Sequence, residues 1–337
     1  MKHFLPVILS LTILTACVDK SYDLSRLDGE VSILPGLELD IPQVFTYKAA
    51  DVFGFSQNPS VQTDEAGYYN LVSDRQVILN DSYPEDRIEA GIDLDYYVII
   101  PFKAEIPDIF KKEDPKLSVP RIDVLVDFDN PCPYSVEVSY KVQVENVQKV
   151  VSFVAPPQSS KCYESVIDNS FRVIPPAMNV LDIRIKKSGS YLEGPPAQAY
   201  NFHMDFGSRI PLEVASGARL DLTADINPLG SALVMNTKKA EIDITVRNYF
   251  GLAMDIESYN PVVPEFSLAF DPISPSTGIV PGRIVAECER GLKAAKDSVT
   301  TVVHFRNDSD RPVRITKDSY LSITAKSITF PEGLYFE

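Results

Sequence analysis

The sequence predicts an all-β protein made of tandem antiparallel β-sandwich modules, Ig-like or transthyretin-like, that follow an extended N-terminal tether. Apolar and polar residues alternate without an error over residues 134–144, the pattern of a strand with one buried face. The 337 residues include 26 prolines, and turn signals recur between short alternating segments. Helical patterns are short, so we expect helices only at residues 106–113, 166–171 and 290–296.

The segment at 134–144 is expected to pair with a strand at 122–128, where the even positions are again apolar. Asn130 between them tolerates a left-handed backbone, and Pro131 and Pro133 lack the N–H groups that a ladder needs. The chain must therefore turn here, and the sequence predicts a hairpin with one face toward a core.

The same design recurs around Asn248 and Asn307. Each copy has a strand, an Asn-led turn, a second strand and then a Ser-Tyr pair. We interpret the three as corresponding hairpins of related modules, and the alternative is that any antiparallel protein yields such hairpins by chance. The turns are 118 and 59 residues apart, which excludes a solenoid of fixed period.

These features divide the chain into five parts. They are a signal peptide at 1–16, a lipidated tether at 17–45, an N-terminal β-rich module at 46–118, a β-sandwich at 119–236 and a C-terminal β-sandwich at 237–337.

The apolar run at residues 4–14 has 11 residues, about half of the ~20 that span a bilayer, which is typical of a signal peptide. Leu14, Thr15, Ala16 and Cys17 resemble a bacterial lipobox, in which the cysteine is acylated and becomes the first residue after cleavage. Cys17 is therefore the predicted lipidation site, and the membrane is a predicted partner through the lipid anchor.

Residue 18 bears on which membrane holds the protein. In the envelopes that this lipobox resembles, an Asp after the cysteine retains a lipoprotein at the inner membrane, whereas this chain has Val18. The resemblance implies the outer membrane. The periplasmic and cell-surface faces both stay open.

Residues 17–24, with Ser21-Tyr22-Asp23-Leu24, and the later acidic-Gly-Tyr turn at 63–71 resemble the opening of uncharacterised lipoproteins from Bacteroidales-type bacteria. This resemblance implies a location in the cell envelope and no activity. Separately, Asp129-Asn130-Pro131 with the strand at 134–144 is similar to the Asn-Pro hairpin of water-stress and late-embryogenesis sandwich domains. That similarity supports a β-sandwich.

The charge of the chain excludes one class of partner. Removing residues 1–16 takes away one base, Lys2, and no acid, so 31 basic side chains would stand against 47 acidic ones, a net charge of −16. Phosphate backbones would be repelled, so we expect no nucleic-acid partner.

Three cysteines follow Cys17, at 132, 162 and 288. An envelope compartment permits disulfides, and an odd number leaves at least one thiol unpaired. We expect Cys132 and Cys162 to form a disulfide, because both flank strand-like segments of one module; the alternative is three small buried thiols.

Chemistry-bearing patterns are sparse. His203 and His304 lie about a hundred residues apart with no local triad or zinc spacing, so we expect no enzyme and no cofactor. Oxygen-rich turns at Asp127, Asp129 and Asn130 and at residues 307–310 are weak candidates for a metal, and solvated turns explain them better.

Three tyrosines are candidates for a ligand-binding surface. The chain has 16 tyrosines and no tryptophan, and Tyr68, Tyr69 and Tyr83 lie near turns where they could form an exposed ligand surface.

The leading hypothesis is a lipid-anchored cell-envelope protein with a non-catalytic binding or scaffold role at the outer membrane, with a protein or glycan partner. One alternative is a fimbria-like subunit that assembles by donating the strand at 321–330. A second is a glycan-binding accessory lipoprotein. A hydrolase would require a cleft that brings His203 or His304 against carboxylates.

Overall fold

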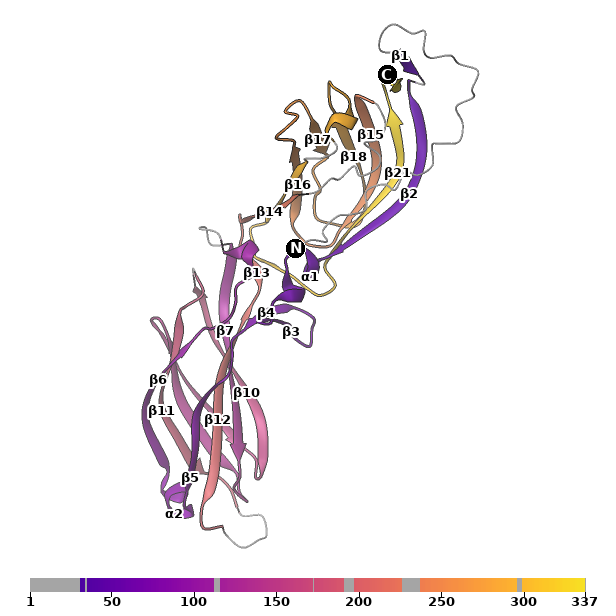
Figure 1. The fold of residues 1–337 in the computed structure, drawn as a ribbon. Coiled ribbons are helices and arrows are strands. Elements are labelled where there is room, and N and C mark those ends of the chain that lie inside the picture. The colour runs from indigo at the N-terminus through magenta and orange to yellow at the C-terminus, as the bar shows by residue number, and fades with distance from the viewer. Residues whose placement is uncertain are drawn as a thin grey trace. The chain divides into compact units, whose positions relative to one another are not determined.

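The computed structural model describes residues 31–33, 35–111, 116–171, 173–190, 197–225, 237–295 and 299–336. It divides into two compact units, one made of residues 1–55 and 216–337 and the other of residues 56–215. We call these unit 1 and unit 2. Unit 2 is therefore inserted into the sequence of unit 1, and the two are described separately (Figure 1).

Unit 2 contains thirteen of the elements. They are β3 (Val61–Thr63), β4 (Tyr69–Val72), β5 (Gln76–Tyr83), α2 (Glu85–Ala90), β6 (Ile92–Pro101), η3 (Asp108–Phe110), β7 (Leu117–Asn130), β8 (Val136–Val144), β9 (Val147–Ala155), β10 (Ser159–Phe171), β11 (Ala177–Lys187), β12 (Tyr200–Pro211) and β13 (Glu213–Val214).

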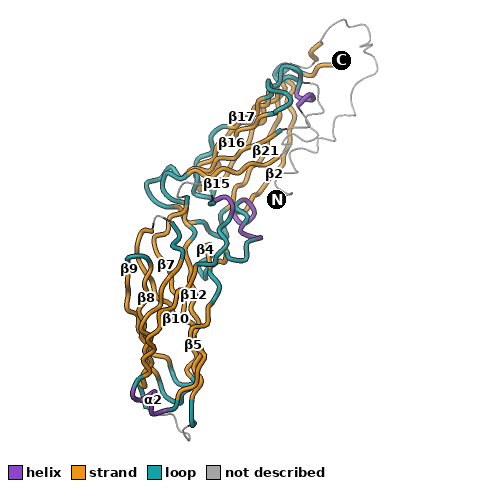
Figure 2. Tube along the Cα trace, turned by 60° about the vertical axis from the view of Figure 1, so that its left-hand side comes forward, coloured by secondary structure: helices purple, strands orange, loops and turns teal. Residues whose placement is uncertain are grey.

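Two antiparallel sheets form unit 2, and Figure 2 shows strands along most of its trace. One sheet has the order β6-β11-β8-β9, and in the other β10, β7 and β12 are adjacent, with β5 and β4 both paired to β12. The inner faces interdigitate as alternation requires: Tyr140 packs edge-on against Phe206, and Phe128 contacts both Phe153 and Phe202. Each such buried ring contributes about 2–3 kcal/mol of hydrophobic stabilisation.

Unit 1 contains the remaining elements, with η2 at its junction to unit 2. They are β1 (Val31–Ile33), β2 (Leu37–Lys48), α1 (Ala49–Val52), η2 (Phe55–Gln57), β14 (Arg219–Asp225), β15 (Lys239–Asn248), β16 (Ala253–Tyr259), β17 (Ser267–Phe270), β18 (Ser276–Glu287), η5 (Leu292–Ala295), β19 (Thr300–Arg306), β20 (Val313–Arg314), β21 (Tyr320–Phe330) and β22 (Leu334–Phe336).

The strands of unit 1 follow the order β14-β19-β16-β17-β18-β15-β21-β2. The short β17–β18 ladder joins a first half, β14-β19-β16-β17, to a second half, β18-β15-β21-β2. Phe53, which follows α1, packs against Phe250 and Phe305 in the core. The prediction of an all-β protein with tandem antiparallel sandwiches is therefore confirmed.

The two units have the same strand topology. The order β6-β11-β8-β9 of unit 2 corresponds to β14-β19-β16-β17 of unit 1, and β10-β7-β12-β5 corresponds to β18-β15-β21-β2. Chain order is preserved as well, because the first long strand of each unit, β5 or β2, lies beside the last long strand, β12 or β21. Unit 2 is inserted between the first and second of these corresponding strands of unit 1.

The three Asn-led turns share one hydrogen-bond pattern. The Oδ1 atoms of Asn130, Asn248 and Asn307 each accept from the backbone N–H two residues on, and the Nδ2 atoms donate to the carbonyl four residues on. Asn130 and Asn248 also donate to the carbonyl 26 residues further along. The same amide pattern therefore recurs at all three turns. Only Asn130 and Asn248 occupy corresponding places, at the ends of β7 and β15, whereas Asn307 follows β19, which corresponds to β11.

The prediction that these turns close hairpins is wrong. Asn130 ends β7, which pairs with β10 and β12, whereas the following strand β8 pairs with β9 and β11. The turns at Asn248 and Asn307 likewise lead into strands that do not pair with the one before. Each turn carries the chain from one half of a unit to the other, because alternation identifies a buried face and not the neighbouring strand.

The expected module boundaries also differ from the structure. Residues 46–118 do not form a separate module, because β5 pairs with β12 and β6 pairs with β11 inside unit 2. Residues 37–45, expected in the tether, belong to β2, whose partner is β21. The expected signal peptide at 1–16 and the rest of the tether up to residue 30 lie outside the described residues.

The helix expected at 166–171 is the end of strand β10, and the described parts of 106–113 and 290–296 contain short 3-10 turns at Asp108–Phe110 and Leu292–Ala295. The Ser-Tyr pairs do not correspond either. Tyr140 is buried in the core of unit 2, whereas Tyr259 is 54% exposed.

Candidate binding surface

The outer face of the β6-β11-β8-β9 sheet carries a row of four side chains, three apolar and one basic. Residues Tyr97, Leu181, Lys141 and Val150 are direct neighbours across the four strands. Ile99 lies beside Tyr97 on the same face, two residues along β6. We call these five residues the β6 face.

Exposure distinguishes the β6 face from an ordinary sheet surface. Tyr97 is 63% exposed, Ile99 54% and Val150 65%, and Val154 on the same face of β9 is 53% exposed. Scattered single apolar side chains are normal on a protein surface, whereas exposed apolar side chains gathered on one sheet face make that face a candidate binding surface.

Ion pairs lie at one end of the β6 face. Arg184 Nε is 2.7 Å from Asp93 Oδ1, and Lys141 Nζ is 2.5 Å from Asp182 Oδ2. Asp182 has φ of 50° at the point where the register of β11 shifts against β6 and β8, which marks a β-bulge. Acidic residues thus border the apolar row at the α2 end of β6.

The outer face of the other sheet of unit 2 is charged and internally paired. Asp123, with a side chain 1% exposed, accepts from Arg209 Nε at 3.0 Å and lies 3.1 Å from Arg121 Nε. Burial opposes the charge of Arg209, but Asp123 and Glu164 outweigh it and raise its pKa. Such an internally paired face leaves few groups for a partner.

His304 in unit 1 is one of the two histidines that a hydrolase would need beside carboxylates. Its Nδ1 atom is 2.7 Å from Asp221 Oδ1, and its Nε2 atom is 3.4 Å from Glu257 Oε2. Burial of Asp221 opposes its ionisation, yet hydrogen bonds from His304 and Arg219 hold its pKa below the usual range. This arrangement links β14, β19 and β16 across the sheet by charge.

His203 lies on the outer face of β12, where its Nε2 atom is 3.2 Å from Asp205 Oδ2 and its neighbour on β7 is Asp129. Asp127 on the same face is held by Arg75, whose Nε atom is 3.3 Å away.

The structure does not bring the weak metal candidates together. Asn130 is buried and its amide hydrogen-bonds the backbone of the turn, away from the outward-facing Asp127 and Asp129. Asn307 and Ser309 likewise bond to each other and to the Arg311 carbonyl. Within the described ranges no group of three or more His, Cys, Asp or Glu residues could hold a metal ion.

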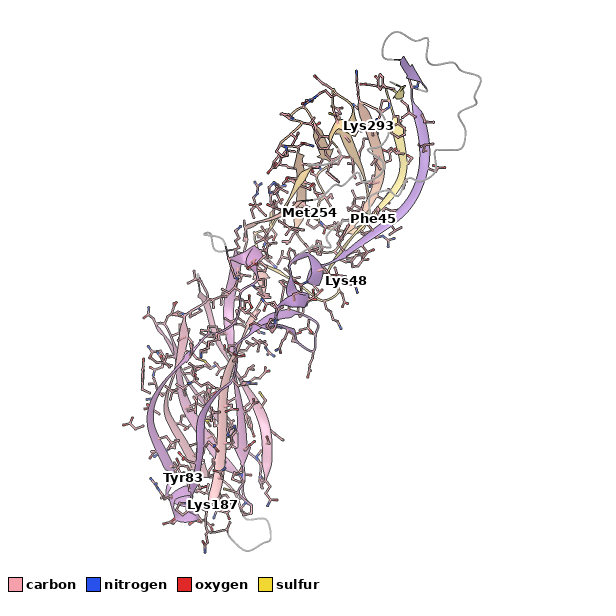
Figure 3. The ribbon with its side chains drawn as sticks, viewed as in Figure 1. Phe45, Lys48, Tyr83, Lys187, Met254 and Lys293 are labelled. Carbon is pink, nitrogen blue, oxygen red and sulfur yellow. The ribbon has the colours of Figure 1, made fainter. Side chains whose placement is uncertain are left out.

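The expected tyrosine surface is wrong for two of its three members. Tyr69 is 9% and Tyr83 8% exposed, and Tyr83 stacks near Phe202 in the core. Tyr68 is half-buried. Figure 3 shows Tyr83 and Lys187 at the α2 end of unit 2, where Lys187 lies over the ring of the buried Tyr134.

The expected Cys132–Cys162 disulfide does not form, and Cys288 is a free thiol as well. Cys162 is opposite Asp127 on β7, five residues before Cys132. At ~3.3 Å per residue that offset is about 16 Å, well beyond disulfide reach. Burial raises the pKa of Cys132 to about 11, so this thiol is inert.

Sequence reasoning missed Tyr97, Ile99 and Val150. A signal was present, because β6 has apolar residues at both parities from Tyr96 to Ile100, whereas a half-buried strand needs only one apolar parity. Cys17, the predicted lipidation site, lies outside the described residues.

Comparisons with known proteins give structural likeness only. No family model and no curated protein matches the chain. A "putative secreted protein" of Parabacteroides distasonis ATCC 8503 is 12% identical with a TM-score of 0.42, over 87% of this chain and 99% of that one. The CBM22-1–CBM22-2 tandem domain of Xyn10C from Paenibacillus barcinonensis is 8% identical with a TM-score of 0.18, over 77% and 98%.

A third likeness is to infectious bursal disease virus, Gx strain, at 9% identity and a TM-score of 0.22, over 86% of this chain and 42% of that one. Values this low do not indicate a shared function. None of the described helices is long and apolar enough to cross a membrane.

Proposed function

We propose that this protein is a lipid-anchored component of the outer membrane that binds a partner through the β6 face and has no catalytic role. The exposed apolar row across the β6-β11-β8-β9 sheet carries the binding part of the proposal. The lipobox at residues 14–17 supports the anchor.

The β6 face suits a polypeptide partner better than the other candidates. Tyr97 could stack on a sugar ring, but its neighbours Leu181 and Ile99 are aliphatic. The described residues also leave one backbone edge of β6 unpaired. The fimbria-like alternative through residues 321–330 is disfavoured, because β21 already pairs with β15 on one side and β2 on the other.

Acylation tests the anchor. We expect mass spectrometry of the native protein to find acyl chains on Cys17, and the Cys17→Ser variant to leave the membrane fraction. Cleavage before another residue, or unchanged membrane association of the variant, would refute the anchor. Protease treatment of intact cells then distinguishes the cell-surface from the periplasmic face.

Crosslinking tests the binding surface. A photo-crosslinking residue at position 97 in intact cells should capture a discrete partner, whereas the same residue at position 221, on the charged face of unit 1, should not. Equal capture at both positions would contradict the assignment of the β6 face.

A further inference from the structure

The free edge of β6 is the strongest unexplained feature of unit 2. β6 pairs with β11 on one side and is the last strand of its sheet in the described part of the chain. Its backbone N–H and C=O groups on the other side are therefore available to another strand.

The opposite edge of the same sheet, at β9, also has no second backbone partner in the described part of the chain, but its side chains reach across to β10. Phe153 of β9 stacks on Tyr163 of β10 with ring centroids 3.8 Å apart, and Lys149 Nζ donates to the Val166 carbonyl at 2.5 Å. A lysine and an aromatic pair thus seal the β9 side of the sandwich, as edge protection requires.

The outward side chains of β6 follow a directional order. Asp93 and Asp95 come first, then Tyr97 and Ile99. Asp93 is paired with Arg184, whereas Asp95 is exposed and makes no ion pair with any described residue. The strand therefore presents one unmatched negative charge followed by two exposed apolar side chains.

This order specifies the occupant. A strand that adds antiparallel to β6 places its side chains opposite Ile99, Tyr97 and Asp95 in that sequence. A second copy of β6 contains no base, so it cannot supply a positive charge opposite Asp95. A complementary segment therefore has two alternate apolar residues followed by a base, and β6 of a second copy is not such a segment.

We propose that the free edge of β6 binds an extended segment of a partner protein by antiparallel strand addition, with apolar residues opposite Ile99 and Tyr97 and a Lys or Arg opposite Asp95. This inference rests on the proposed binding role of the β6 face and names its partner class. It does not depend on the lipid anchor, so either can fail alone.

A labelled octapeptide serves as the probe. Its sequence, Ser-Val-Thr-Val-Thr-Lys-Thr-Ser, places valines opposite Ile99 and Tyr97 and lysine opposite Asp95. Fluorescence anisotropy with the folded chain should show saturable binding, and hydrogen exchange should show protection along β6. No saturable binding up to about 1 mM, a common range for weak recognition, would overturn the proposal.

Backbone methylation separates strand addition from contact by side chains alone. Only every second N–H of an added strand points at β6. N-methylation at one set of alternate peptide residues should abolish binding, and at the other set should leave it intact. Equal effects of the two sets would contradict strand addition.

Charge reversal tests the order of side chains. Asp95→Lys should weaken the lysine peptide about threefold to fivefold and strengthen a glutamate version by a similar factor. Ile99→Lys should weaken both about tenfold. The control Val262→Lys, at a valine of unit 1 that is 68% exposed and lies outside the β6 face, should change neither.

Other occupants give distinct results. Concentration-dependent self-association that Ile99→Lys removes would identify a second copy as the occupant and overturn the proposal. Equal binding of the lysine and glutamate peptides to the Asp95→Lys variant would refute the predicted charge pairing.

Discussion

Strand β6 of unit 2 and strand β14 of unit 1 occupy corresponding places in the shared strand topology, but their outward side chains differ. β14 has outward residues Arg219 and Asp221, which pair with each other, and Asp221 also contacts His304 of the next strand. β6 is longer and has Tyr97 and Ile99 outward, both more than half exposed. One edge is protected by paired charge and its counterpart is apolar, so topology alone does not decide which unit binds.

The largest expected effect concerns the shared Asn turns. Asn130→Ala should lower the free energy of unfolding of unit 2 by about 3 kcal/mol, because two buried carbonyls and one buried N–H lose this partner and the Pro156 carbonyl keeps only its bond from Ser159. Asn248→Ala should cost unit 1 about 2 kcal/mol, because one of its bonds is 3.5 Å long. Urea unfolding followed by circular dichroism measures both. Equal costs would mean that the extra bonds of Asn130 add no stability.

Buried and exposed ion pairs give the next contrast. Asp123→Asn in unit 2 should cost about 2 kcal/mol, since it weakens the partner of Arg209 and Arg121 at a buried site. Asp255→Asn in unit 1 should cost under about 1 kcal/mol, because its pair with Arg306 is a third exposed or more. Thermal unfolding of both variants at low and high salt provides the measurement. A larger loss of stability in Asp255→Asn than in Asp123→Asn would contradict this ranking.

Two glycines give a smaller difference. A Cβ atom on Gly207 would lie 2.6 Å from Arg75 Cδ, so Gly207→Ala must displace Arg75 from Asp127 and should cost about 1 kcal/mol. Gly282→Ala in unit 1 would meet Ile244 at 3.5 Å, an ordinary contact, and should be near neutral. Differential scanning calorimetry resolves the pair. A neutral Gly207 variant would show that Arg75 moves aside without loss.

The raised pKa values of two tyrosines give the smallest effect, because they change the stability only at high pH and not at neutral pH. Burial raises the pKa of Tyr140 in unit 2 and of Tyr47 in unit 1 from 10.0 to about 12. Because each phenol has a higher pKa in the folded than in the unfolded chain, its contribution to the free energy of unfolding is fully present below pH 10. That contribution is lost as the pH rises toward 12. Absorbance at 295 nm should show both phenols ionising only near base unfolding. Variants with Phe at either position would remove that late step.

The sequence predicted the β class and the recurring Asn turns, because alternation and the amide pattern are local properties. The predicted pairing of the strands on either side of Asn130 was wrong, because β7 and β8 belong to different sheets. A turn between two sheets has the same local sequence pattern as a hairpin turn. Tyr69 and Tyr83 were expected at the surface from nearby turns, yet both face the core of unit 2. The insertion of unit 2 has no local signature at all, because it depends on β2 pairing with β21.

The pairing of Leu37 with Phe330 determines when unit 1 can close. During synthesis from the N-terminus, β2 emerges first and must wait until almost the whole chain has been made before β21 arrives. Unit 2, whose residues are contiguous, can finish folding in that interval. A ribosome or export channel that stalls before residue 320 would therefore release a chain with one completed sandwich and an orphaned leading strand, a ready target for chaperones and proteases.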